Sequence, residues 1–92
     1  MIAFEVSVNR KRVCLAGADR VLSTGVAWTF RDPDNIHFNV GGISTEGGPD
    51  HHCEWIVPAV GVGDEIVIRI VESDSPDPAI HRPFVENPEA QR

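Results

Sequence analysis

The stretch Val60–Glu72, with the sequence VGVGDEIVIRIVE, decides the fold class of this chain. After a Gly-Asp turn, isoleucine at 66, 68 and 70 alternates with Val67, Arg69 and Val71. Successive side chains of a β-strand point to opposite faces, so this period of two places the isoleucines on one face, whereas a helix would scatter them around its axis. The stretch therefore predicts a turn that leads into a long strand with one buried isoleucine face.

Five further segments have the alternation or composition of strands. They are residues 2–8, 12–16, 21–31, 36–40 and 51–57. Residues 9–11 form a turn between the first two, and the run Asp-Pro-Asp-Asn at 32–35 is typical of a hairpin turn, because Pro presets φ and Asn tolerates the left-handed conformation. About six short strands joined by turns predict an all-β fold, either a small antiparallel β-sandwich or a partly open barrel.

The aromatic and sulfur-containing side chains suggest where the core lies. We expect Val26, Trp28 and Phe30, which alternate along residues 21–31, to form its centre, with Trp55 also buried. Cys14 and Cys53 alternate with apolar residues and are expected to be free, buried thiols, with a disulfide between them as the alternative in an oxidising compartment.

The chain has 92 residues and is predicted to form one domain. Residues 1–72 hold the strands, whereas residues 73–92 hold four of the seven prolines and show little periodicity. Ile80, Pro83, Phe84 and Val85 keep this segment from being wholly polar. Residues 73–92 are therefore predicted to be a proline-rich tail or strap that lies across the body or against a neighbouring subunit.

Charge and hydropathy restrict the classes of partner. The formal net charge is -6, and acidic residues are spread along the chain, which argues against a nucleic-acid partner. The basic cluster at residues 10–12 is expected to be a solvated turn, with contact to an acidic partner as the alternative. The sequence predicts no membrane-spanning segment and no signal peptide at its alternating N-terminus, so we expect a cytoplasmic protein.

Residues 50–54, with the sequence DHHCE, are the sharpest candidate for chemistry. In a strand, His51 and Cys53 share one face and His52 lies on the other, and His37 is on a strand that could lie nearby. These four residues are the predicted zinc ligands, although structural zinc sites use four ligands and catalytic ones three. The alternative is an exposed loop at the two histidines beside a packed Cys53.

Other chemical patterns are weaker. A cysteine nucleophile would pair Cys14 or Cys53 with a histidine, yet a reactive thiolate needs an exposed, electropositive setting. The glycines before Asp64 lack the lysine and helix of a phosphate loop, so we expect Gly63 to have a positive φ and Asp64 to bind backbone amides of the turn. Arg69 is predicted to be an outward charge on an edge strand, or, if inward, to pair with Glu5 or Glu54.

One sequence pattern is shared more widely. Trp55, the run VGDEI at 62–66, the run IRI at 68–70, Glu72 and the Asp-Pro steps after it resemble a group of short bacterial all-β proteins that have no assigned activity. The resemblance covers about the last forty residues, and the opening strand and turn look similar too. It implies a β fold and transfers no catalytic residue and no cofactor to this chain.

The sequence thus leads to a functional hypothesis without an active site. We expect a non-enzymatic β domain that binds another protein, or itself as a homo-oligomer, through a sheet edge or the proline-rich tail. No cofactor is expected under this hypothesis. The alternative is a zinc-binding module that uses residues 51–54, and an enzyme with a cysteine nucleophile is a third hypothesis.

Overall fold

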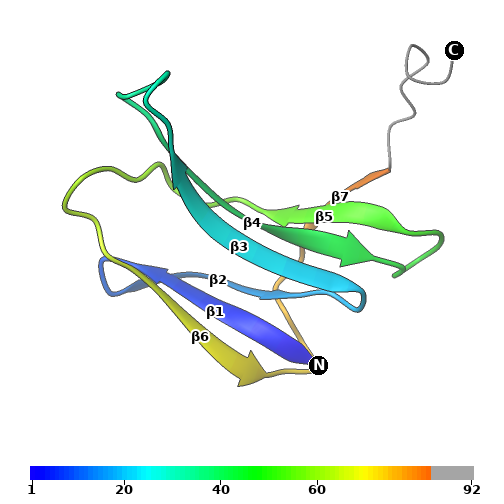
Figure 1. The fold of residues 1–92 in the computed structure, drawn as a ribbon. Helices are drawn as coiled ribbons and strands as arrows, with labels where there is room; N and C mark the ends of the chain where they lie inside the picture. The colour runs from blue at the N-terminus through cyan, green and yellow to red at the C-terminus, as the bar shows by residue number, and fades with distance from the viewer. Residues whose placement is uncertain (84–92) are drawn as a thin grey trace, which may run out of the picture.

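The computed structural model describes residues 1–83, which form two antiparallel β-sheets packed as a sandwich (Figure 1). The strands are β1 (Ile2–Val8), β2 (Lys11–Gly17), β3 (Val21–Trp28), β4 (Ile36–Ser44), β5 (His51–Trp55), β6 (Ile66–Glu72) and β7 (Ile80–Pro83). Sheet A has the strand order β2-β1-β6, and sheet B has the order β3-β4-β5-β7. The predicted all-β sandwich is confirmed. No helix capable of crossing a membrane occurs in residues 1–83.

Sheet A owes its register to two turns. Asn9 and Arg10 have φ values of 52° and 68°, as a two-residue hairpin turn between β1 and β2 requires. At the start of β6, Gly63 has a φ of 94°, and the Asp64 carboxylate accepts a hydrogen bond from the Gly61 N–H at 2.8 Å. The turn predicted from the Gly-Asp pair is therefore confirmed, and it delivers β6 to the free side of β1.

Sheet B contains a strand that the sequence analysis did not separate from the proline-rich segment. Residues 80–83 form β7, which pairs antiparallel with β5. Before it, residues 74–79 run past β2, where Asp77 and Leu15 exchange N–H···O bonds, each of 2.8 Å. We call residues 74–79 the strap. The remainder of the predicted tail, residues 84–92, lies outside the described residues.

The core lies between β1 and β2 on one side and β4 and β5 on the other. It consists of Val6, Cys14, Ala16, Val40, Cys53 and Trp55. Both cysteines are buried and free, as expected, and Trp55 is only 6% exposed. The two sheets therefore pack against each other mainly through small side chains and one indole.

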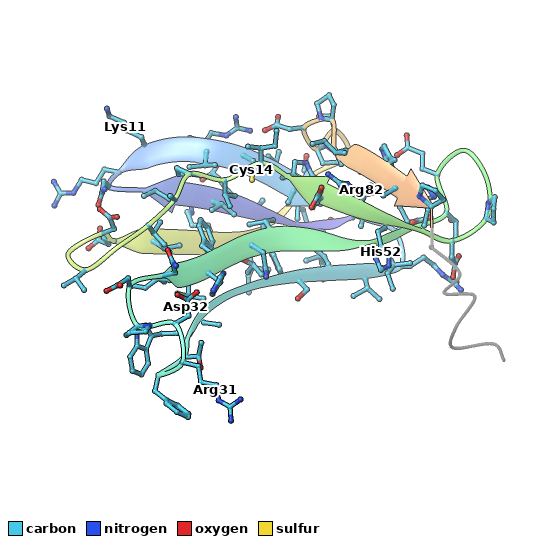
Figure 2. All side chains as sticks on the ribbon, turned by 90° about the horizontal axis from the view of Figure 1, so that it is seen from above. Lys11, Cys14, Arg31, Asp32, His52 and Arg82 are labelled. Atoms are coloured by element: carbon cyan, nitrogen blue, oxygen red, sulfur yellow. The ribbon has the colours of Figure 1, made fainter. Side chains whose placement is uncertain are left out.

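Two expectations about the core were wrong. Val26, Trp28 and Phe30 are 55%, 59% and 75% exposed, because β3 is an edge strand and the hairpin after it extends beyond the sheets (Figures 1 and 2). The isoleucine face of β6 is also incompletely covered, since Ile70 is 73% exposed. Alternation identified the core-facing side of each strand, but it did not reveal whether another sheet covers that side.

Candidate functional site

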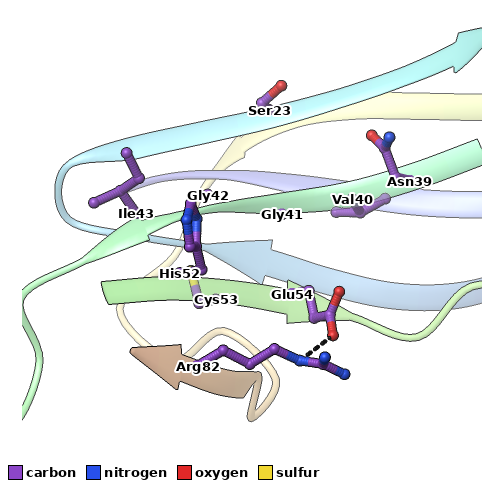
Figure 3. Close-up of a pocket in the computed structure, with 10 residues that line it drawn as sticks. All are labelled: Ser23, Asn39, Val40, Gly41, Gly42, Ile43, His52, Cys53, Glu54 and Arg82. Carbon is purple, nitrogen blue, oxygen red and sulfur yellow. Dashed lines mark ion pairs between the residues drawn. The ribbon is translucent and has the colours of Figure 1, made fainter. Parts of the chain in front are cut away.

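The outer face of sheet B carries a shallow depression of about 480 Å³ (Figure 3). The small residues Ser23, Gly41 and Gly42 line it, and Asn39, His52, Glu54 and Arg82 supply polar groups. Glu54 and Arg82 face each other across β5 and β7, with the Arg82 Nε 2.8 Å from a Glu54 carboxylate oxygen. The charges of Glu54 and Arg82 thus neutralise each other. The depression is a polar surface in which these two residues leave no net charge.

The opposite face of β5 holds a contact between two histidines. The Nε2 of His51 lies 2.7 Å from the Nδ1 of His81 on β7, and the Nδ1 of His51 lies 3.0 Å from the Pro49 carbonyl oxygen. A neutral His51 that donates from Nδ1 to that carbonyl has Nε2 as an acceptor, so His81 then donates from its Nδ1. The pair is therefore a hydrogen-bonded dyad at the edge of the core.

The structure places the four predicted zinc ligands at three different locations. His51 and Cys53 share the core side of β5, whereas His52 lines the outer depression. His37 is 3.5 Å from Asp32 at the far end of β4. His51 pairs with Ser44, seven residues along β4 from His37, a separation of roughly 23 Å at strand spacing.

Within residues 1–83, no group of three or more His, Cys, Asp or Glu side chains is placed to hold a metal ion. The residue that does approach His51 is His81, which the sequence analysis left in the proline-rich segment. A strand of four residues is too short to show a period, so only the Ile-His pair at 80–81 hinted at it.

A cavity of about 580 Å³ lies under the strap and brings Cys53 near acidic side chains. Burial raises the pKa of the Cys53 thiol, and the carboxylates of Asp19 and Glu46 raise it further. The Asp19 carboxylate itself accepts hydrogen bonds from the hydroxyl and N–H of Thr45, which lower its pKa. The cavity therefore keeps Cys53 protonated and does not activate it as a nucleophile.

Cys14 is in a similar position on sheet A. Burial raises the pKa of its thiol, nearby Asp77 raises it further, and Arg12 acts in the opposite direction. Both cysteines thus have the setting of structural thiols.

On one side of the sandwich, apolar side chains that point towards the facing sheet are left exposed. The cross-strand pairs Val6–Ile68 and Phe4–Ile70 place two isoleucines of β6 on the face that carries the core. On sheet B, the partners of Phe38 and Ile36 on that same face are Val26 and Trp28 of β3. We call Val26, Trp28, Ile68 and Ile70 the open side. All four are exposed although they face inward, and Figures 1 and 2 show β3 and β6 at the same side of the molecule.

The edges of sheet A are unequal. The strap covers the β2 edge through the two hydrogen bonds between Asp77 and Leu15. The β6 edge has no partner strand among the described residues. Five of its seven residues are valine or isoleucine, and the other two are Arg69 and Glu72. β6 therefore presents a regular, apolar edge next to the open side.

Comparison with family models, with curated proteins and with solved structures gives no match for this chain. The resemblance to short bacterial all-β proteins stays a prediction.

Proposed function

We propose that this protein is a non-enzymatic binding module whose partner, another protein or a second copy, adds a strand to the free edge of β6. The observation that carries the proposal is the coincidence of an unpaired edge with exposed, inward-facing isoleucines on the same strand. Main-chain hydrogen bonds to the edge would supply affinity, and the apolar side chains of the open side would be covered on binding.

The thiols and the charged groups support a binding role over a catalytic one. Both cysteines are buried with raised pKa values, and the acid and base of the outer depression neutralise each other. A binding module that works through a sheet edge needs no activated side chain.

A proline at position 68 tests the edge directly. The N–H of Ile68 points away from β1, because the hydrogen-bonded pairs of β1 and β6 alternate and include Asn9–Glu65 and Met1–Ser73, so Ile68→Pro blocks strand addition without removing a hydrogen bond of sheet A. Ile68→Ala is the matched control, because it shortens the same side chain and keeps the N–H. Sedimentation velocity over a wide concentration range, and the set of proteins retained by the immobilised chain, should show association that is abolished in Ile68→Pro and only weakened in Ile68→Ala, which loses apolar contact but keeps the edge.

Equal behaviour of Ile68→Pro and Ile68→Ala in both measurements would contradict the proposal. Retention of a protein by the wild-type chain counts in its favour only if Ile68→Pro releases it.

A zinc-binding module is the second candidate, and the contact between His51 and His81 is the observation in its favour. Cys53 pairs with His81 in register and shares its face, so a third potential donor lies on the same side of the β5–β7 pair, although the three are not grouped to hold an ion as they stand in residues 1–83. Zinc titration followed by thermal unfolding tests the candidate. A shift that His81→Ala removes and His37→Ala keeps would support it, whereas no shift in the wild-type chain would remove it.

A further inference from the structure

The hydrogen bonds at both ends of β6 determine which of its main-chain groups are free. The N–H of Asn9 donates to the Glu65 oxygen at 2.8 Å, and the Glu65 N–H donates to the Asn9 side chain at 3.0 Å. At the other end, the Ser73 N–H donates to the Met1 oxygen at 2.9 Å. Hydrogen-bonded positions alternate along an antiparallel strand, so the main-chain N–H and C=O groups of the odd-numbered residues of β6 point towards β1. The N–H and C=O groups of Ile66, Ile68 and Ile70 consequently point to the free edge.

We propose that a second copy of this chain occupies that edge, with the two β6 strands antiparallel about a two-fold axis at Val67. Glu65 of each copy then lies opposite Arg69 of the other, and Ile66 lies opposite Ile68. The inference rests on the proposed function and names the partner, because it fixes which strand is added and in which register.

Charge selects this register among the symmetric ones. A two-fold axis at residue 66, 67, 68, 69 or 70 places Arg69 opposite Gly63, Glu65, Val67, Arg69 or Val71 of the second copy, respectively. Only the axis at Val67 gives Arg69 a carboxylate, and the axis at Arg69 places like charges together. Opposite charges directly across a strand pair stabilise it, and like charges destabilise it.

The local surroundings of Arg69 are compatible with this pairing. Its side chain is 70% exposed and its Nη1 is 3.5 Å from a carboxylate oxygen of Glu5, so the present contact is loose and leaves donors available. In the dimer Arg69 would lie between Glu5 of its own chain and Glu65 of the second copy.

Apolar side chains on the two faces of β6 add to the interface. Val67, which is 42% exposed, would meet its own symmetry mate. On the core face, Ile68 would lie opposite Ile66 of the second copy and diagonal to its Ile68, where sheet A becomes continuous across the axis. Specific dimers generally bury about 1,200 Å² or more, so the open sides of both copies are needed in addition to the edge.

Two single charge reversals and their mixture test the register. In Glu65→Arg both facing positions are basic, and in Arg69→Glu both are acidic, so each variant should self-associate at least tenfold more weakly than the wild-type chain. An equimolar mixture of the two variants pairs acid with base at both positions and should form a heterodimer, detected by sedimentation velocity and by its mass in native mass spectrometry.

Folding of the variants is controlled separately. Arg69→Glu faces Glu5 within its own sheet, so if it unfolds the experiment uses Arg69→Glu with Glu5→Gln, which removes that repulsion. A wild-type chain that remains a monomer at all concentrations would overturn the inference, as would a mixture that forms no heterodimer. Where Ile68→Pro abolishes association but the mixture fails, the register is wrong and strand addition at the β6 edge still stands.

Discussion

The indole nitrogen of Trp55 donates a hydrogen bond of 2.9 Å to the main-chain oxygen of Asp77, joining the strap to the centre of sheet B. The same Asp77 exchanges hydrogen bonds with Leu15 on the edge of sheet A. One residue of the strap therefore bridges both sheets at the side opposite to the open side. These contacts hold the strap against the β2 edge, whereas no described strand lies beyond the β6 edge.

The Asp77 carboxylate should contribute measurably to stability. Asp77→Ala removes the acceptor of the Leu15 N–H, which is partly buried, and should lower the free energy of unfolding by about 1–2 kcal/mol. Chemical denaturation followed by tryptophan fluorescence measures the change. Asp34→Ala is the control, since Asp34 is an exposed aspartate without a described hydrogen bond or ion pair, and its effect should stay within about 0.5 kcal/mol. Equal losses in the two variants would show that the hydrogen bond from the Leu15 N–H to the Asp77 carboxylate does not contribute to the free energy of unfolding.

The Asp64 turn predicts a dependence of stability on pH. Hydrogen bonds from the Asn9 side chain and the Gly61 N–H lower the pKa of the Asp64 carboxyl. A carboxyl whose pKa is lower in the folded than in the unfolded chain stabilises the fold above the unfolded pKa of about 4, and this contribution is lost as the pH falls through the folded pKa. Asp64→Asn should therefore unfold at a lower temperature than the wild-type chain at pH 7, and the two melting temperatures should converge in acid.

The measurement is a series of thermal melts from neutral to acidic pH. Asp19 also has a lowered pKa, and it changes the stability of both proteins with pH in the same way. The difference in melting temperature between the wild-type chain and Asp64→Asn therefore reports on Asp64 alone. A gap in melting temperature that stays constant down to the lowest pH would contradict the assignment.

The sequence was sufficient to predict local structure wherever a short motif determines the backbone. The Gly63-Asp64 turn and the alternation of β6 are examples, because a positive φ and a period of two are local properties. Burial was harder to predict. Trp28 and Trp55 have the same alternating context, yet only Trp55 lies under a second sheet, and that depends on the order of strands.

The candidate sites depended even more on pairing between distant strands. His51, His52 and His37 were predicted to lie close together, because two of them are adjacent in sequence and the third is on another predicted strand. In the β4–β5 register, His51 pairs with Ser44, so His37 lies at the other end of β4. The β5–β7 pairing instead places His81 beside His51. Register between strands far apart in sequence is set by packing, which a single sequence does not display.

The two cysteines should behave as structural thiols. Both are buried, and burial is the largest cause of the raised pKa of each thiol, so the thiolate is scarce at neutral pH. Alkylation of Cys14 and Cys53 in the native protein should be slow and should become rapid in denaturant. Val62→Cys supplies a fully exposed reference thiol in the same chain, because Val62 is completely exposed. Labelling of Cys53 as fast as the reference would revive the hypothesis of a cysteine nucleophile.

Two glycines on the paired strands β3 and β4 should respond in opposite ways to alanine. A Cβ at Gly42 would overlap the main-chain oxygen of Val21, so the two strands would have to separate. Gly42→Ala should therefore lower the free energy of unfolding by about 2 kcal/mol or more. A Cβ at Gly25 meets no atom within 4 Å, and alanine restricts the unfolded chain, so Gly25→Ala should raise the free energy of unfolding by about 0.5 kcal/mol. Denaturant unfolding of both variants measures the contrast, and an equal loss in both would mean that close approach of the strands at Val21 is not what requires glycine at position 42.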